Sequence, residues 1–310
     1  MVQLTDRLNK VNHFLDNPQP HEKWCMPKGR GGVKKYDKDW RPFTGPLSPT
    51  SKATAINSIN TLLNYWQKFG YIKVNVLHLI DIQQFQKSKE VGRLKVVERA
   101  LTGDEWRAML KVVSLLPVKT LIQRQEQARI KFLLYTLLIT ALRREEIANL
   151  AWNHIGKLRD TWRLEVVGKG GKPALLVLPD NFIKLANNYR ALFSYPALDE
   201  NCDSNENRAV FFSLKTYKRL SGGYINRLIK RVAMQAQSFV VDEAAKKRLG
   251  QVSAHWIRHT AATVLDDAGV NKDIIQSHMR HNSSATTDVY IHKNTRVVKD
   301  ALNSLVEVCD

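Results

Sequence analysis

Cysteine is scarce in this sequence of 310 residues. The three cysteines stand far apart, and no two of them form a CxxC pair: Cys25, Cys202 and Cys309. An odd number of scattered cysteines favours neither a disulfide framework nor a zinc ribbon. We therefore expect no bound metal and a reducing compartment such as the cytoplasm.

Long apolar stretches are also missing. The longest, residues 132–142, is too short to cross a bilayer and contains tyrosine and threonine. Asp6, Arg7 and Lys10 stand where a signal peptide would have its apolar core. The sequence predicts neither a membrane protein nor a secreted one.

Acidic residues are few beside the basic ones. There are 29 Asp and Glu against 48 Lys and Arg, which gives a formal net charge of +19. Such an excess predicts a polyanionic partner, most often nucleic acid. One candidate contact is the basic, glycine-rich segment 28–35, whose cations are Lys28, Arg30, Lys34 and Lys35. The alternative for this segment is a solvated loop.

The length allows two domains, and a helix is predicted in the first. Ser48 and Pro49 suit its cap and first turn, and Gly70 suits its end. Apolar residues recur inside it at helical spacing, and we expect this stripe to be buried: Ile56, Ile59, Leu62, Leu63 and Trp66.

A linker is predicted over residues 84–100, which are rich in Lys, Glu and Arg. Thr102 and Glu105 then have the spacing of a capping box that opens a new helix. We therefore expect a helical domain at residues 1–95 and a second domain at residues 96–310. The second domain should end in a tail helix at residues 295–310.

The second domain is predicted to be mainly helical with a small antiparallel β-sheet. Residues 130–142 form a broad apolar helix face. Alternation at residues 162–166, a Gly/Lys turn at 168–172 and a return at 174–178 predict a hairpin. Residues 209–212 are a candidate third strand. Helices are expected at 255–268, 272–279 and 285–292, with Gly269 as a stop.

Four local patterns in this domain bear chemically useful side chains. They are Arg143 with Glu146 three positions later; Lys169 and Lys172 in the hairpin turn; His255 and Arg258 at i and i+3; and His281 followed by Tyr290. Each pattern alone has an ordinary structural interpretation: a surface ion pair, a solvated turn, neighbours on one helix face, or a core aromatic.

Together the four patterns resemble the tyrosine recombinase (phage integrase) family. Residues 141–147 (ALRREEI) resemble its first arginine motif, and residues 255–259 (HWIRH) resemble its H-x-x-R-H box. Lys169, between two glycines, resembles its hairpin lysine. His281 and Tyr290 have the spacing of its last histidine and its nucleophile. All six positions are filled, and the resemblance covers residues 100–295, with residues 45–95 similar in general character.

The resemblance implies a two-domain DNA clamp, with a helical core-binding domain followed by a mixed α/β catalytic domain. It implies an enzyme that cuts and rejoins DNA strands at specific sites through a 3′-phosphotyrosine, without metal, ATP or another cofactor. Arg143 and Arg258 would grip the phosphate oxygens, and Tyr290 would be the nucleophile.

The remaining roles come from the same resemblance. His255 would be the general base, and Lys169 would be the general acid, with Lys172 as the fallback. His281 would hydrogen-bond the phosphate and help to seat the nucleophile. Glu146 would orient the helix that carries the first arginine.

The sequence departs from the family at a few positions. Arg280 stands where the family usually has glycine before its last histidine, and it is interpreted either as a phosphate contact or as a solvent-facing residue. Alanine at position 141 replaces the glycine of the first arginine motif. The N-terminal domain begins like the middle of the core-binding domain, as if its first helices were short or missing.

The expected partner is double-stranded DNA that carries a recombination site. The resemblance also implies a homotetramer on two duplexes, assembled through the C-terminal helix with Val298, Leu302 and Leu305. The alternative is that this helix packs on its own domain. A prokaryotic protein of the cytoplasm, associated with the nucleoid, would fit these expectations.

Three other functions fit parts of the sequence. A metal hydrolase is suggested by His255 and His259 at i, i+4 and by His278 and His281 at i, i+3, but no HExxH motif completes a site. A non-catalytic DNA-binding protein explains the charge but gives Tyr290 no purpose. A type IB topoisomerase-like enzyme would share the chemistry while acting as a monomer on one duplex.

Overall fold

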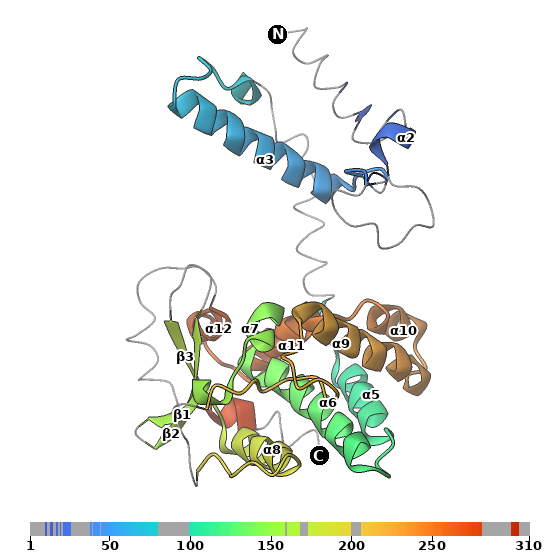
Figure 1. Cartoon of the computed structure of the whole chain (residues 1–310), viewed down its shortest axis with the longest axis vertical. Helices are drawn as coiled ribbons and strands as arrows, with labels where there is room; N and C mark the ends of the chain where they lie inside the picture. The colour runs from blue at the N-terminus through green and yellow to red at the C-terminus, as the bar shows by residue number, and fades with distance from the viewer. Residues whose placement is uncertain are drawn as a thin grey trace. The chain divides into compact units, whose positions relative to one another are not determined.

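The computed structural model describes residues 10, 13–14, 17, 19, 21–25, 38, 40–43, 45–79, 99–158, 160–167, 173–199, 206–280 and 299–303. The chain divides into two compact units, Met1–Lys95 and Val96–Asp310. Helices dominate the described part of both units, and one small sheet lies in the second (Figure 1).

The first unit is built on the long helix α3 (Pro49–Lys68), with the short helix α2 (His21–Trp24) and the 3-10 turn η1 (Val76–Leu79). The predicted cap and stop of α3 are confirmed. The Ser48 side chain accepts a hydrogen bond from the backbone N–H of Ser51, and Gly70 ends the helix with a φ of 76°. Asn75 is buried and ties the following turn to α3, because its Nδ2 donates to Asn60 and Asn64 at 2.7 and 2.6 Å.

The prediction of a buried stripe on α3 is wrong for most of its members. Ile56 is buried, but the side chains of Ile59, Leu62 and Trp66 are between 40 and 45% exposed. Helical spacing places these residues on one face, but it does not determine whether another element covers that face.

The second unit is organised around α6 (Leu121–Thr140), from which residues 129–130 and 132–140 are buried. Three further helices pack against α6: α5 (Gly103–Ser114), α8 (Asp180–Ala191) and α11 (Ala254–Asp267). The ring of Phe132 stacks against Phe182 and Tyr189, with centroids 5.4 and 5.0 Å apart. Because the C-terminal end of α6 is buried in this core, it fixes the position of the chain segment that leads into α7 (Arg144–Ala148).

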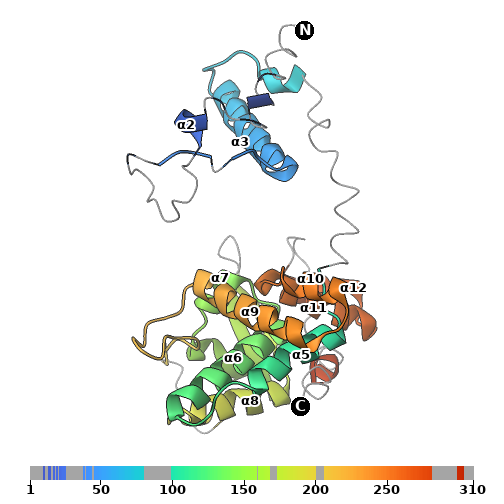
Figure 2. The ribbon, with the colours of Figure 1, turned by 90° about the vertical axis from the view of Figure 1, so that its right-hand side faces the viewer.

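The helix α9 (Gly222–Ala236) packs against α5 (Figure 2), and α7, α10 (Glu243–Leu249) and the 3-10 turn η4 (Gln237–Phe239) pack against α9. The helix α12 (Lys272–Met279) packs against α11, and the 3-10 turn η3 (Trp152–His154) leads directly into the sheet. The capping box of Thr102 and Glu105 opens α5 as predicted. Near it, the Leu101 N–H donates to Thr260 on α11 at 2.9 Å, which fixes α11 beside the start of the unit.

The sheet has three antiparallel strands in the order β1 (Ile155–Leu158), β2 (Thr161–Val167) and β3 (Pro173–Val177). It lies at one side of the helices of its unit (Figure 1). The predicted hairpin is β2–β3, in which Val167 pairs with Pro173.

The identity of the third strand differs from the prediction. Residues 209–212 do not join the sheet; Ala209 and Phe212 form isolated bridges with Ala151 and Arg219. The third strand is β1, which lacks the length and the alternation that would reveal it in the sequence. Its burial pattern shows a single buried residue, Ile155.

The described part of the predicted tail helix, residues 299–303, is helical and packs on its own unit. Leu302 is fully buried in the core, and Lys299 forms an ion pair with Asp180 at 2.8 Å. Within the part of the chain that the structure describes, no helix is long and apolar enough to cross a membrane.

Candidate active site

Arg143 is held at the junction between α6 and α7. Ala141 caps α6 in a left-handed conformation, with a φ of 47°, and so turns the chain towards α7. Arg143 is the N-cap of α7, and its backbone N–H donates to Oε2 of Glu146 at 2.7 Å. Its Nη1 donates to Oε1 of the same carboxylate at 3.1 Å. Glu146 therefore fixes both the main chain and the side chain of Arg143.

Arg258 reaches the same place from α11. It is 4% exposed, and its two terminal nitrogens donate to the backbone carbonyls of Ala141 and Met279. These carbonyls close the C-terminal ends of α6 and α12, where helices carry partial negative charge. The guanidinium thus joins three helices at one point.

Arg280 enters from the end of α12. Its Nη2 donates to Oε2 of Glu146 at 2.7 Å and lies 3.5 Å from the carbonyl oxygen of Ala141. Its own carbonyl accepts a hydrogen bond from Nη2 of Arg143 at 3.3 Å. We call these four side chains the arginine cluster: Arg143, Arg258, Arg280 and Glu146.

The arginine cluster carries more positive than negative charge. The cluster contains three guanidiniums and one carboxylate, so the formal charge of the cluster is about +2 when all four groups are ionised. Burial, together with Arg280 and Arg143, lowers the pKa of Arg258 to about 10, which leaves it protonated at neutral pH. Burial also lowers the pKa of Arg280. A site with this excess suits an oxyanion such as a phosphodiester.

His255 lies one turn before Arg258 on α11. Partial burial and the charges of Arg258, Arg99 and Arg143 lower the pKa of its imidazole below the usual value. The ring is therefore mostly neutral at pH 7 and can accept a proton. Its Nε2 is 2.9 Å from Nε2 of His259, so in the neutral pair one nitrogen donates and the other accepts.

Of the predicted catalytic residues, the structure brings together Arg143, His255 and Arg258. Glu146 and Arg280 lie beside them. Eight predicted residues lie outside the described part of the chain: Lys28, Arg30, Lys34, Lys35, Lys169, Lys172, His281 and Tyr290.

Three interactions at the site were not predicted from the sequence. The positive charge of Arg99 helps to lower the pKa of His255. The backbone carbonyl of Ala141 accepts hydrogen bonds from the guanidiniums of Arg258 and Arg280. In the third, Nε2 of His278 donates to the carbonyl of Ile139 at 2.8 Å. Burial lowers the pKa of His278 to about 4. No local pattern reveals these three interactions, because each joins residues that are far apart in the sequence.

The suggested metal site finds no complete donor set in the described residues. There, no group of three or more His, Cys, Asp or Glu side chains gathers as a metal site would require. His278 is buried and bonded to a backbone carbonyl.

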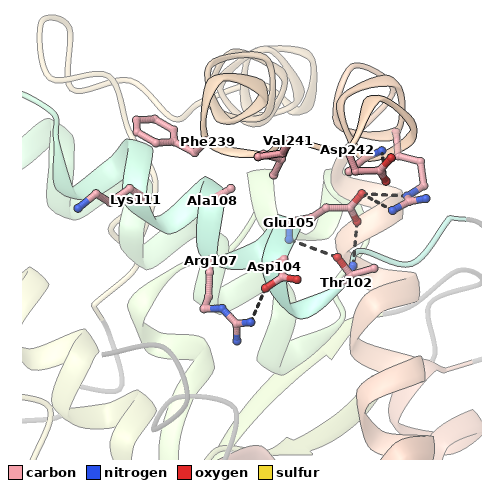
Figure 3. A pocket seen from close by; sticks show the side chains of 12 residues that line it. Thr102, Asp104, Glu105, Arg107, Ala108, Lys111, Phe239, Val241 and Asp242 are labelled. Carbon is pink, nitrogen blue, oxygen red and sulfur yellow. Dashed lines mark hydrogen bonds and ion pairs between the residues drawn. The ribbon is translucent and has the colours of Figure 1, made fainter.

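A separate pocket of about 730 Å³ lies between α5, η4 and α10 (Figure 3). Acidic and basic side chains both line it, and Glu105 bridges Thr102 and Arg248 there. None of the predicted catalytic residues lines this pocket. The mixed charges give it no preference for a polyanion.

Comparisons with known proteins agree with the resemblance found in the sequence. The phage integrase family matches residues 99–296, a range that includes all six predicted catalytic positions. A tyrosine recombinase of Thermosipho africanus is 25% identical over 256 residues, covering 83% of this chain and 76% of that protein. Tyrosine recombinase XerC of Caldanaerobacter subterraneus is 26% identical over 259 residues, covering 83% of this chain and 63% of that protein.

Among solved structures, one integrase is similar to this chain. The integrase from mycobacterium phage Brujita is 18% identical and has a TM-score of 0.44, covering 86% of this chain and 74% of that chain.

Proposed function

Because the chain belongs to the phage integrase family and is therefore an enzyme of the tyrosine recombinase type, we propose that it recombines DNA at specific sites by breaking and rejoining strands. Tyr290 attacks the scissile phosphorus, and a covalent 3′-phosphotyrosine forms as the bond from phosphorus to the 5′-oxygen breaks. The free 5′-hydroxyl of a partner strand reverses the reaction. Because the covalent link conserves the energy of the phosphodiester bond, rejoining needs no ATP. In this proposal the arginines supply the charge stabilisation that a metal ion would otherwise give.

The observation that carries this proposal is the arginine cluster beside His255. In the transition state, negative charge grows on the nonbridging oxygens, and Arg143 and Arg258 are held on rigid helix ends to meet it. Removing one preorganised donor of this kind commonly costs about a hundred- to thousandfold in rate. In this proposal the excess charge of the cluster is balanced by the phosphate.

Proton transfer is assigned to two residues. The tyrosine hydroxyl has an ordinary pKa near 10 and must lose its proton as it attacks. His255, with its lowered pKa, accepts that proton. Lys169 gives a proton to the departing 5′-oxygen, with Lys172 as the alternative donor. His281 hydrogen-bonds the phosphate and helps to seat Tyr290.

The partner in this proposal is a DNA duplex, and two duplexes meet in the full reaction. Residues 1–95 act as the core-binding domain, and residues 96–310 act as the catalytic domain. Phosphate contacts are assigned to Lys28, Arg30, Lys34 and Lys35. The enzyme would work on the DNA of a prokaryotic cytoplasm.

Assembly into a tetramer through residues 295–310 is part of the same proposal. In a single chain, Leu302 fills the core of its own unit. Exchange between protomers would place the same helix in the equivalent position of a neighbour, which costs little when identical contacts are remade.

The test is covalent trapping on nicked duplexes made from the DNA that flanks the gene. A nick near the cut lets the short fragment leave and strands the enzyme on the DNA. Wild type, but not Tyr290→Phe, should give a protease-sensitive adduct on a denaturing gel with EDTA present. Binding without any adduct in wild type would favour a non-catalytic DNA-binding protein.

A further inference from the structure

Arg280 occupies a backbone position that disfavours its own residue type. It caps α12 in the left-handed region, with φ 51° and ψ 45°. Glycine adopts this conformation readily, whereas a side chain with a Cβ is strained there. A long cationic side chain at such a position indicates that the side chain has a use that outweighs the strain.

The side chain of Arg280 is buried and only partly satisfied. It is 7% exposed, and one nitrogen, Nη2, is bound to Glu146. Nε and Nη1 are buried and have no hydrogen-bond partner in the described structure. A buried donor left unpaired is costly, so these two N–H groups point to a ligand that supplies acceptors.

The charges around Arg280 indicate the chemistry of that ligand. The one carboxylate of the arginine cluster already accepts from Arg143 and from Arg280. The positive charge of Arg280 also contributes to the lowered pKa of Arg258. Because the cluster has too few anions for its cations, the missing acceptor should be negatively charged. Nε and Nη1 lie on different edges of the guanidinium, so each of them can donate separately to a phosphate oxygen.

We propose that Arg280 is a third catalytic arginine, which donates a hydrogen bond from one of its unpaired N–H groups to a nonbridging oxygen of the scissile phosphate. This proposal rests on the proposed function, and it adds to the pair Arg143 and Arg258 a residue that the family pattern does not contain. In the free protein, Arg280 is kept in place by Glu146 and by the end of α12. Arg280 also helps to hold Arg143, because the backbone carbonyl of Arg280 accepts a hydrogen bond from Nη2 of Arg143.

The experiment compares a charged and a neutral scissile phosphate. Nicked duplexes would carry either a normal phosphodiester or a methylphosphonate, in which a methyl group replaces one nonbridging oxygen and removes the charge. Wild type, Arg280→Gly and Arg280→Gln would be compared for the rate of adduct formation. Glycine suits the left-handed backbone, and glutamine keeps much of the side-chain length without the charge.

Arg124→Gln is the matched control. Arg124 is exposed in the first turn of α6, whereas Arg143 follows the last turn of that helix. At 1.5 Å per residue the two lie roughly 25 Å apart, so this variant loses one positive charge far from the arginine cluster.

We expect both Arg280 variants to cleave the phosphodiester about a hundredfold more slowly than wild type, in line with the loss of one preorganised donor. On the methylphosphonate the difference should shrink to within about fivefold, because the charge that Arg280 balances is gone. Arg124→Gln should match wild type on both substrates. Equal losses on both substrates would overturn the proposal and leave Arg280 a structural role, and no loss on either would overturn it as well.

A second measurement needs no DNA cleavage. Inorganic phosphate should stabilise the wild-type protein against heat, and Arg280→Gln should need at least about tenfold more phosphate for the same shift of Tm. An unchanged phosphate titration would contradict the proposal even if no adduct forms. Absence of an adduct in wild type, together with a normal phosphate response, would instead count against the proposed recombinase reaction alone.

Discussion

At the scale of single residues, the site depends on how one carboxylate is shared. Glu146 accepts from the backbone of Arg143, from its side chain and from Arg280. A carboxylate bound in this way fixes the directions of two guanidiniums before any substrate arrives. Preorganisation of this kind is what makes charge stabilisation effective, because little reorganisation is needed in the transition state.

The lowered pKa of His255 leads to a prediction about pH. A general base works when it is deprotonated, so a pKa below 6.5 keeps His255 active into mildly acidic solution. With enzyme in excess over the DNA, we expect the rate of adduct formation to fall on the acid side with a midpoint below 6.5. His255→Gln should be slower by about a hundredfold and should lose this acid limb.

The measurement is a single-turnover pH–rate profile on the nicked duplex, with DNA binding checked at each pH. His154→Gln is the matched control, since burial also lowers the pKa of this histidine, and it lies beside the sheet on η3. An unchanged acid limb in His255→Gln would show that another group titrates.

At the scale of elements, the site is made where the ends of α6, α11 and α12 meet. Arg258 joins the last carbonyls of α6 and α12, and His278 joins α12 to Ile139 near the end of α6. These contacts use backbone acceptors that helices leave free at their C-terminal ends. The positions of the arginines thus follow from helix packing in the core.

His278 makes the stability of this junction depend on pH. Its pKa is about 4 in the folded protein and near 6.5 in an unfolded chain, so the unfolded state binds the extra proton between these values. Stability therefore falls as pH drops through this window. From pH 7 to pH 5 we expect His278 to account for a loss of about 2 kcal/mol.

Urea denaturation followed by circular dichroism at pH 7 and pH 5 measures this effect. His278→Gln should be less stable than wild type at pH 7 but should lose about 2 kcal/mol less on acidification. His78→Gln, at an exposed position of the first unit, is the control. If His278→Gln and wild type lost the same stability, the buried neutral imidazole would not be the cause.

Local elements were largely predictable from the sequence, and contacts between them were not. The caps at Ser48 and Thr102 and the β2–β3 hairpin follow from short-range signals. The link between Arg280 and Glu146 spans 134 residues, and no spacing rule encodes it. The exposed face of α3 was mistaken for core because periodicity shows only that apolar residues share a side.

At the scale of the whole molecule, the net charge of +19 and the family membership both favour nucleic acid as the partner. The resemblance was visible in the sequence because six positions, filled by arginine, lysine, histidine and tyrosine, occur in the right order. The family match over residues 99–296 confirms it. The structure adds the physical arrangement of three of the six predicted catalytic residues, together with Glu146 and Arg280.

The charge predicts a strong dependence of DNA binding on salt. If about eight phosphates are neutralised, the logarithm of the binding constant should fall with the logarithm of salt concentration at a slope of about −7. Fluorescence anisotropy with a labelled duplex at several salt concentrations measures this slope. A slope near zero would mean that phosphate contacts contribute little to binding.

The central claim is that Tyr290 becomes covalently joined to a DNA phosphate held by the arginine cluster. The most direct measurement is to digest the trapped adduct with protease and nuclease and to identify the modified peptide by mass spectrometry. We predict a nucleotide attached through a phosphodiester to Tyr290, with no such peptide from Arg258→Ala. Attachment at any other residue, or its persistence in Tyr290→Phe, would contradict the claim.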